Sequence, residues 1–444
     1  MLDPRRCRLN QWPRKMPTPW SARRAGRVRN VLQRLTSVRP ARPRRRPVPR
    51  QTDISPRRRW IVMIALAAGG FAIGTTEFVS MGLLPLIAQD FGITEDRAGL
   101  IISAYALGVV VGAPTITALS GRMPRRRLLL LLMSAFFLGH LLAVFADSYP
   151  TLIAARVIAG LPHGAYFSVA GLSAASMSPP GKRGQAVAFI GMGLSVATVA
   201  GVPAAQALGQ AFGWSAAYLL VAAIAVATVV ALWFLMPHMS EMPPTSVRTE
   251  LGALGRSQVW LTLALGAVGF GGMFAVYTYI TWTMTERAGL DVSWMWLILL
   301  AYGVGSVGGQ WLGGVIADRN LEIGILFSLV MIGVVLVGFY FTSTHVVIGT
   351  INFGLIGFFG SSLTPTLQVR LMDVAGDAQT LAASLNHSAL NLANAGGAAL
   401  GGAVIAAGFG YAAPALAGAG LAVAAILIWF PTVYLRARSA RTPS

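Results

Sequence analysis

The sequence predicts an all-α membrane protein whose twelve transmembrane helices form two six-helix bundles related by an internal repeat. Three observations lead to this prediction: the apolar composition, twelve apolar runs of membrane-spanning length, and a repeat that relates the two halves of the chain. Of the 444 residues, 55% are hydrophobic and only 11% are charged, and the mean hydropathy is +0.64. Soluble domains have about a quarter of their residues charged, so the composition excludes a water-soluble fold.

Twelve apolar runs account for most of the chain beyond residue 60. A helix that crosses a bilayer needs roughly 20 mainly apolar residues. In the first half such runs lie near 61–87, 98–119, 127–146, 151–176, 185–210 and 214–237. In the second half they lie near 259–284, 294–317, 322–342, 345–368, 380–407 and 412–435. We therefore expect a first bundle over 60–237, a cytoplasmic linker over 238–258, a second bundle over 259–436 and a short cytoplasmic tail over 437–444.

The first 59 residues form a basic tail that carries most of the net charge. They hold 19 Lys or Arg against two acidic residues, a net +17 of the +20 for the whole chain. With few apolar residues and no periodicity, the tail is expected to be disordered. Three interpretations of the tail are open: a solvated cytosolic tail, the product of a start codon placed too far upstream, or a segment that contacts anionic lipid or nucleic acid. The first two interpretations are favoured, so no nucleic-acid partner is expected. Cys7, the only cysteine, lies here, so no disulfide framework or Cys metal site is expected.

The loop charges predict the orientation of the chain, because Lys and Arg accumulate in short loops on the cytoplasmic side. One side holds Arg57 to Arg59, Arg122, Arg125 to Arg127, Lys182, Arg183, Arg248, Arg256, Arg319, Arg370, Arg436, Arg438 and Arg441. The other side holds only Arg97 and Arg287. We therefore expect both termini in the cytoplasm, an even number of crossings and a location in the cell membrane, inner or plasma.

An internal repeat relates the two halves without a gap. Adding 197 to a first-half position recovers a like residue in several separate stretches. The matches are Gly92 with Gly289, Leu100 with Leu297, Ile101 with Ile298, Ala104 with Ala301, Tyr105 with Tyr302, Gly108 with Gly305, Gly112 with Gly309, Arg122 with Arg319, Phe212 with Phe409 and Gly213 with Gly410. A parallel repeat of this kind is typical of two bundles that rock about a central site.

The first transmembrane helix carries an acidic residue, Glu77, within the string GTTEFVSMGLLP over 74–85. A charge at the middle of a membrane helix costs about 2.5 to 3.5 kcal/mol, so such a group faces a cavity, finds a partner or stays protonated. A carboxyl group removed from water keeps its proton more readily, which suits reversible proton binding. The alternative is a buried acid that is hydrogen-bonded for structural reasons.

Arg156 is the second charge inside the predicted membrane region, within LIAARVIAGLPHG over 152–164. If Arg156 and Glu77 face one cavity, each compensates the charge of the other. Competition for that pairing would then link protonation to conformation. A structural role for Arg156 near the extracellular mouth is the alternative.

The eleventh helix carries a polar face. His387, Asn391 and Asn394 stand at positions i, i+4 and i+7, so they share one side of a helix that is expected to line a cavity. Solute binding and hydrogen bonding between helices are both compatible with this face.

Aromatic residues on the seventh helix add further candidates for solute binding. Tyr277, Tyr279 and Trp282, with Gln310 on the eighth helix, are suited to stack on and hydrogen-bond an amphipathic solute. Aromatic side chains also mark the membrane interface, which is the stronger alternative here. Glycines that recur every four residues, such as Gly108 and Gly112 or Gly305 and Gly309, are expected to allow close helix packing.

No catalytic pattern accompanies these residues. The sequence contains no P-loop, no HExxH spacing and no plausible nucleophile triad. We therefore expect no enzyme activity, no metal and no cofactor.

Several motifs resemble the major facilitator superfamily, in particular its twelve-helix drug:proton antiporter branch, which includes arabinose and sugar efflux permeases. The most specific is GTTEFVSMGLLPLIAQDFGI over 74–93, which looks like the helix-one signature of that branch. The pattern LxxxRxxxG over 152–160, GVP over 201–203 and LNHSALNLANAGGAALGG over 385–402 are similar to its motifs on helices four, five and eleven. The resemblance spans about 60–436 and implies that Glu77 is one of the membrane acids of that branch, which the leading hypothesis below takes as the group that binds the proton.

The loop between helices two and three departs from the family pattern. In SGRMPRRR over 120–127, Gly121 stands where the family has an acid and Pro124 where it has a glycine. The second-half copy, GGVIADR over 313–319, keeps Asp318, so a charge lock is expected only there. The candidate gating residues are Arg122, Arg125, Arg126, Asp318 and Arg319. Membrane orientation alone would also explain the loop arginines.

The leading hypothesis is a secondary transporter that exports a small organic solute, such as a drug-like compound, sugar or nucleoside, in exchange for protons by alternating access. Its partners would be the solute, protons and the lipid bilayer, and a monomer is expected. An uncoupled facilitator or importer is the first alternative. A membrane receptor or scaffold is the second, although an anchor needs neither the repeat nor the polar face of helix eleven.

Overall fold

The computed structural model describes residues 55–439, apart from 94 and 240–244. The disorder expected over 1–59 lies outside the described residues for 1–54, whereas Pro56 to Arg59, which the prediction also placed in the tail, form the first turn of α2 with Ser55 as its N-cap. Contacts place the described residues up to Tyr434 in one compact unit. This unit contains the membrane-crossing helices up to Tyr434.

Twelve helical spans in the described residues are long and apolar enough to cross a membrane, which confirms the predicted number. In the first half the helices are α2 (Pro56–Gly82), α5 (Leu100–Leu119), α6 (Arg125–Val144), α7 (Tyr149–Gly160) with α8 (His163–Met177), α9 (Arg183–Val196) with α10 (Val202–Phe212), and α11 (Trp214–Leu235). In the second half they are α13 (Ser257–Trp282), α14 (Met295–Arg319), α15 (Leu321–Thr342), α16 (Val346–Val374), α17 (Gln379–Val404) and α18 (Ala413–Ser439). The short helices α3 (Leu84–Phe91), α4 (Glu95–Ala98) and α12 (Val247–Leu251) lie between spans.

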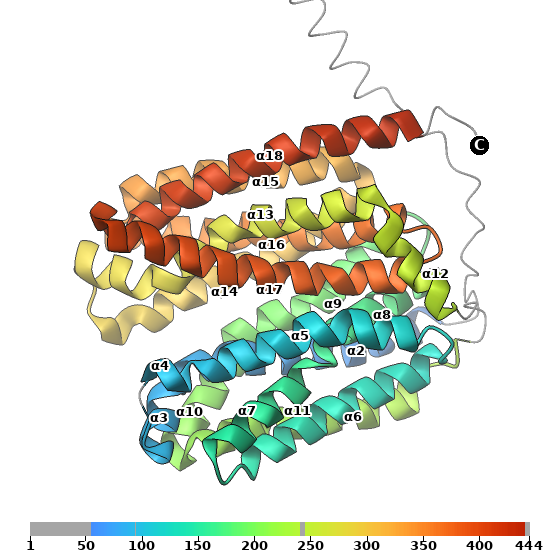
Figure 1. Ribbon diagram of the computed structural model, residues 1–444, viewed down its shortest axis with the longest axis horizontal. Helices are drawn as coiled ribbons and strands as arrows, with labels where there is room; N and C mark the ends of the chain where they lie inside the picture. The colour runs from blue at the N-terminus through green and yellow to red at the C-terminus, as the bar shows by residue number, and fades with distance from the viewer. Residues whose placement is uncertain (1–54, 94, 240–244, 440–444) are drawn as a thin grey trace, which may run out of the picture. The chain divides into compact units, whose positions relative to one another are not determined.

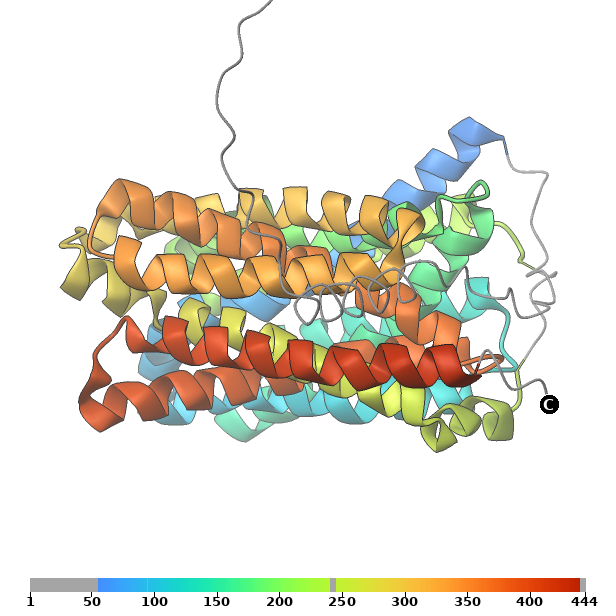
Figure 2. The same ribbon diagram turned by 90° about the horizontal axis from the view of Figure 1, so that it is seen from above.

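The helices are grouped as two bundles. In Figure 1 the second-half helices α13 to α18 lie above the first-half helices α2 to α11, and Figure 2 shows the same arrangement from above. Across the boundary, α9 contacts both α14 and α16, and α17 contacts α5 and α8. We call the end at which α2 begins the proximal end, and the opposite end the distal end; α12 lies at the proximal end (Figure 1). The exact limits of the two bundles and the linker remain a prediction.

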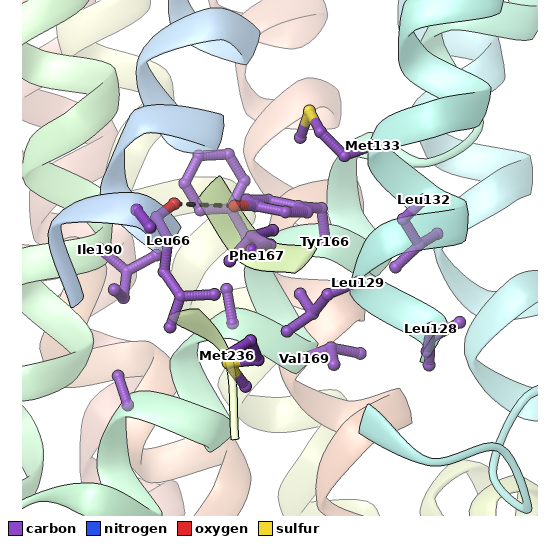
Figure 3. Close-up of a cluster of buried hydrophobic side chains, with 14 of the residues drawn as sticks. Leu66, Leu128, Leu129, Leu132, Met133, Tyr166, Phe167, Val169, Ile190 and Met236 are labelled. Carbon is purple, nitrogen blue, oxygen red and sulfur yellow. Dashed lines mark hydrogen bonds between the residues drawn. The ribbon is translucent and has the colours of Figure 1, made fainter. Parts of the chain in front are cut away.

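Each bundle has its own hydrophobic core. In the first half, Leu128, Leu129 and Leu132 of α6 pack with residues of α2, α8 and α9, as Figure 3 shows. The Tyr166 hydroxyl donates a hydrogen bond of 2.8 Å to the Leu66 carbonyl of α2 within this cluster. The ring of Tyr166 can approach α2 because Gly69 faces it, and a Cβ at that position would collide with the ring. The second half has a separate core of comparable composition on α13 to α18.

Backbone geometry repeats at the offset of 197 residues. Gly92 has a φ of +61° and its counterpart Gly289 has +71°. Gly213 has a φ of +92° and its counterpart Gly410 has +81°. These left-handed conformations favour glycine, so the repeat found in the sequence corresponds to equivalent turns in the two bundles.

Helix crossings repeat at the same offset. A Cβ at Gly108 of α5 would meet the Val157 carbonyl of α7, and a Cβ at Gly305 of α14 would meet the carbonyl of Gly354 in α16. Positions 157 and 354 are again separated by 197 residues. In the same way, a Cβ at Gly112 would meet the Leu161 carbonyl, and a Cβ at Gly309 would meet the Phe358 carbonyl. The expectation that these glycines permit close helix packing is confirmed.

The close crossing of α14 and α16 predicts a cost for any side chain at Gly309. We expect Gly309→Ala to lower the melting temperature of the purified protein, because overpacking of a tight contact costs about 1 to 3 kcal/mol. Thermal unfolding in detergent measures this shift. Gly420→Ala is the matched control, because Gly420 has no neighbour within 4 Å and alanine favours a helix. An unchanged melting temperature for Gly309→Ala would contradict the crossing described here.

Candidate functional site

A cavity lies between the two halves, about midway along the helices. It has a volume of about 90 Å³ and is partly open to solvent. Helices α2, α8 and α9 line it from the first half, and α13, α14, α16 and α17 line it from the second. Its polar lining consists of Glu77, His163, Ser195, Thr198, Ser306, Gln310, Ser361, Thr364, Gln368, His387, Asn391 and Asn394. Its apolar lining includes Phe78, Phe167, Met273, Phe274 and Tyr302.

The cavity brings together several residues that the sequence singled out far apart. Glu77, Gln310, His387, Asn391 and Asn394 all line it. The polar face of α17 therefore faces the cavity, as its spacing indicated. The amide of Asn391 also donates a hydrogen bond of 2.9 Å to the backbone carbonyl of His387, one turn earlier.

The two tyrosine candidates lie outside this lining. Tyr277 packs edge-on against Phe78, with ring centroids 6.1 Å apart, and contacts Tyr302, which does line the cavity. Tyr279 instead faces α17, where its hydroxyl donates a hydrogen bond of 3.0 Å to the Ala398 carbonyl. Its ring packs where Cβ atoms at Gly401 and Gly402 would collide with it. Tyr279 is thus a packing residue between α13 and α17 in this structure.

Glu77 is half-buried at the wall of the cavity. Within the part of the chain that the structure describes, no hydrogen bond or ion pair holds its carboxylate. The guanidinium of Arg156 is near enough to act on Glu77 electrostatically, although the two do not form a direct ion pair. The carboxylate is therefore open to the cavity while it remains in the field of a buried cation.

Arg156 is buried, with 1% of its surface exposed, and it lies outside the cavity lining. Its Nη1 donates a hydrogen bond of 2.9 Å to the Thr76 hydroxyl, adjacent to Glu77. The guanidinium also lies over two aromatic rings, 4.4 Å from the centroid of Tyr105 and 5.4 Å from that of Tyr218. Cation–π contacts of this kind stabilise a desolvated arginine, so Arg156 is held here by Thr76 and two aromatic rings.

Thr76 connects Arg156 to a buried histidine that the sequence did not single out. His140 Nδ1 donates to the Phe136 carbonyl at 2.8 Å, because a carbonyl only accepts. The other nitrogen of a neutral ring must then accept, and it lies 2.8 Å from the Thr76 hydroxyl. The Thr76 hydroxyl thus donates a hydrogen bond to His140 and accepts one from Arg156. The donor of each of these three hydrogen bonds is therefore determined. A histidine in an apolar run, SAFFLGHLLAV over 134–144, was the available signal.

A second missed residue, His163, lies at the boundary between the halves. It begins α8, and its ring lies 5.3 Å from the ring of His387 on α17. His163 Nδ1 shares a hydrogen bond of 3.1 Å with the Tyr105 hydroxyl, and Tyr105 lies under Arg156. His387 in turn stacks on Phe167 of α8, with centroids 4.5 Å apart. The floor of the cavity is therefore made of rings from both halves.

Several buried polar atoms around the cavity have no hydrogen-bond partner in the described part of the chain. They are Nε2 of His163, Nε2 of His387 and Oε1 of Gln310. Buried polar atoms ordinarily have a hydrogen-bond partner, so these atoms are suited to bond a polar solute. In the described residues, no group of three His, Cys, Asp or Glu side chains is placed to hold a metal ion.

Hydrogen bonds between the halves gather at the proximal end. Asp318 of α14 accepts from the backbone N–H groups of Gly184 and Gln185, at 2.6 and 3.0 Å. Arg125 donates to the Thr380 hydroxyl at 2.9 Å, and Arg183 pairs with Asp373 at 3.4 Å. Among the hydrogen bonds that join helices of the two halves within the described chain, none lies in the distal third. The proximal side of the cavity is therefore closed by polar contacts.

The other gating candidates do not cross the boundary. Arg126 binds the Trp233 carbonyl of the first half and His238 at the start of the linker, with its guanidinium 5.8 Å from the centroid of the Trp233 ring. Arg122 and Arg319 are exposed. Arg125 and Asp318 are thus the two gating candidates that contact the opposite half.

Comparison with known proteins identifies the relatives of this chain. The sequence profile of the Major Facilitator Superfamily matches residues 66–355. The inner membrane transport protein YdhP of Escherichia coli (strain K12) is 40% identical over 368 residues, which cover 83% of this chain and 95% of the relative. A chloramphenicol resistance protein of Streptomyces lividans is 33% identical over 374 residues, which cover 82% of this chain and 94% of the relative.

A solved structure shares the same fold. The proton:xylose symporter XylE, bound to 6-bromo-6-deoxy-D-glucose, aligns with a TM-score of 0.71 and 15% sequence identity. The alignment covers 84% of this chain and 96% of that one. At this identity the likeness concerns the fold alone.

The chain of bonds through Thr76 predicts a stability effect. Thr76→Val keeps the shape of the side chain but leaves Arg156 Nη1 and His140 Nε2 without this partner. We expect a loss of about 1 to 3 kcal/mol of folding free energy, which is typical of a buried polar group left unsatisfied. Thermal unfolding of the purified protein measures it. Thr115→Val is the control, because the Thr115 side chain is exposed and bonds only to a carbonyl of its own helix; equal melting temperatures for both variants would refute the network.

Proposed function

The chain belongs to the Major Facilitator Superfamily, and we propose that it exports a small organic solute in exchange for protons by alternating access. Membership of this family means that it is a multi-pass membrane protein that transports a small solute. Proton coupling, the direction of transport and the class of solute are the parts proposed here.

The observation that carries the proposal is the composition of the central cavity. Glu77, an acid with no hydrogen-bond partner among the described residues, shares one cavity with His387, Asn391, Asn394 and Gln310 from the opposite half. A proton site and a solute site in the same space compete for that space and for the same electrostatic field. Such competition is what couples two fluxes in opposite directions.

Arg156 provides a physical reason for the competition. When Glu77 is ionised, it compensates part of the charge of the buried guanidinium, which acts on it electrostatically. When Glu77 is protonated, that compensation is lost and Arg156 depends on Thr76 and the two tyrosine rings. The electrostatic balance of the first half therefore changes with the proton, which gives the two protonation states different conformational preferences.

The cavity lining supports an organic solute with both polar and apolar parts. Imidazole and amide groups with free hydrogen-bonding capacity stand beside Phe78, Phe167 and Phe274. A wall of this kind binds a solute by ring contacts and orients it with a few hydrogen bonds. The name of the Streptomyces relative, a chloramphenicol resistance protein, supports a drug-like solute and export.

The direction of transport rests on orientation and conformation together. If the Arg-rich proximal end faces the cytoplasm, as the loop charges predict, then the structure is closed toward the cytoplasm. Release of solute on the outer side, followed by entry of a proton to Glu77, would complete the export step from this state.

Binding of the solute can be tested before its identity is known. We expect a thermal-shift screen over sugars, nucleosides, amino acids and drug-like compounds to find a ligand that raises the melting temperature, because a ligand at 100 times its Kd stabilises the folded state by about 2.7 kcal/mol. His387→Ala should reduce that shift at the same ligand concentration. Leu392→Ala, on the exposed face of the same helix, should leave it unchanged. Equal shifts in both variants would place the solute elsewhere.

Proton coupling is tested by Glu77→Gln in proteoliposomes with the solute found in that screen. A glutamine cannot carry the proton, so we expect transport driven by a pH gradient to fall to the level of protein-free liposomes while solute counterflow continues. Asp147→Asn, at an exposed acid of the distal end, is the control. Full gradient-driven transport by Glu77→Gln would exclude the proton role. Wild-type flux that ignores the gradient would instead identify an uncoupled facilitator.

A further inference from the structure

The two halves differ in the loop that follows the second helix of each bundle. The second-half loop has Asp318, and the offset of 197 residues places Gly121 at the equivalent position in the first half. A glycine has no side chain to form the contact that Asp318 forms. The first half thus lacks one of a pair of symmetric carboxylates.

In the second half, the contact made by Asp318 joins the two bundles. Its carboxylate accepts hydrogen bonds from Gly184 N at 2.6 Å and Gln185 N at 3.0 Å. These groups belong to the first turn of α9, whose N–H groups have no partner within the helix. A carboxylate at this position also interacts favourably with the helix dipole.

A carboxylate from the linker occupies the equivalent position in the first half. The offset maps Gly184 onto Leu381, in the first turn of α17. Leu381 N donates a hydrogen bond of 2.9 Å to Oε2 of Glu250. Glu250 belongs to α12, the short linker helix, and is fully buried. The acceptor required by symmetry is therefore present, but another part of the chain supplies it.

Further contacts hold this carboxylate in place. The Thr245 hydroxyl donates to Oε1 of Glu250 at 2.7 Å. Arg125, the gating candidate that also bonds Thr380 of α17, is close enough to Glu250 to act on it electrostatically. Both oxygens of Glu250 are thus engaged, and a cation of the first half stands beside them.

The glycine at 121 is what admits the linker. Thr245 N donates a hydrogen bond of 2.8 Å to the Gly121 carbonyl. A Cβ at Gly121 would lie 2.6 Å from the Thr245 hydroxyl oxygen and 2.7 Å from its carbonyl oxygen. An aspartate at position 121 would therefore displace the segment that carries Glu250. The glycine at position 121 and the position of the linker segment that carries Glu250 therefore depend on each other.

We propose that Glu250 is the gate carboxylate of the first half, so that the linker between the two bundles is a working part of the proximal gate. The gate opens when Leu381 N leaves Glu250 and Gly184 N leaves Asp318. Release of α17 from Glu250 frees α12, which contacts both α5 and α17. This inference rests on the alternating access of the proposed function.

The test measures distances at both ends of the full-length protein in lipid nanodiscs by electron spin resonance. Spin labels are attached to Met123→Cys and Asp377→Cys at the proximal end, and to Asp147→Cys and Thr344→Cys at the distal end, in a Cys7→Ser background. All four positions are exposed and lie in different halves within each pair. The two label pairs distinguish opening of the gate from structural damage. Opening lengthens the distance within one pair and shortens the distance within the other, whereas damage broadens the distance distributions of both pairs.

We expect Glu250→Ala to raise the ratio of proximally open to closed molecules by about tenfold, because hydrogen bonds to a charged group are the stronger class. The proximal distance should lengthen and the distal distance shorten. Asp318→Ala should produce the same change, since it breaks the symmetric contact. Glu250→Gln, which keeps the shape and removes the charge, should produce a smaller change in the same direction. Glu286→Ala, at an exposed acid of the distal end, is the matched control and should change neither distance.

Two outcomes would overturn the inference and leave the proposed function standing. In the first, Asp318→Ala changes the distances of both label pairs while Glu250→Ala leaves both distances unchanged. In the second, both Glu250 variants broaden the distance distributions of both pairs, which would give Glu250 a structural role only. If no variant and no bound solute changes either distance, alternating access itself fails.

Discussion

Hydrocarbon offers no hydrogen bonds, and this constraint governs where every polar group of the protein lies. A polar group inside the membrane must find a partner within the protein or face a cavity. Arg156 meets the constraint with Thr76 and two aromatic rings. Arg370 meets it near the proximal end with Glu322 and with Thr262, whose hydroxyl lies 3.2 Å from Nε. The polar groups left over, Glu77 among them, face the space that both halves enclose.

The two bundles share a backbone plan but differ in chemistry. Offset by 197 residues, Arg156 corresponds to Phe353 and Glu77 to Phe274. The tyrosine beneath the arginine is kept: Tyr105 lies under Arg156, and its counterpart Tyr302 packs on Phe353 with centroids 5.0 Å apart. At these two positions the first half thus carries charged side chains and the second half carries apolar rings. In the proposed mechanism, this difference would let the first half respond to a proton while the second half forms the surface against which the first half moves.

The fold was predictable because the membrane imposes it locally. Length and apolarity of each run determined the twelve spans, and the glycines at 92, 289, 213 and 410 marked the equivalent turns. The polar face of α17 was predictable from helical spacing alone. His140, His163 and Glu250 were not, because each acts through a partner on another helix and more than 50 residues away, such as Thr76 for His140, Tyr105 for His163 or Leu381 for Glu250. Periodicity contains no information about such partners.

The sequence by itself determined that lipid surrounds the helices, how many times the chain crosses the membrane, that the two halves repeat, and which polar residues must face a cavity. It could do so because a transmembrane helix makes all its backbone hydrogen bonds within itself, so its composition reflects its surroundings. Only the tertiary structure decided which candidates meet. It placed Glu77 with the polar face of α17, turned Tyr279 away to pack on that helix, and separated Arg156 from a direct pairing with Glu77. It also placed the carboxylate of Glu250 where the repeat would require an acid from position 121. Contacts between distant segments depend on how the helices cross, and that geometry is set by the packing of the whole bundle.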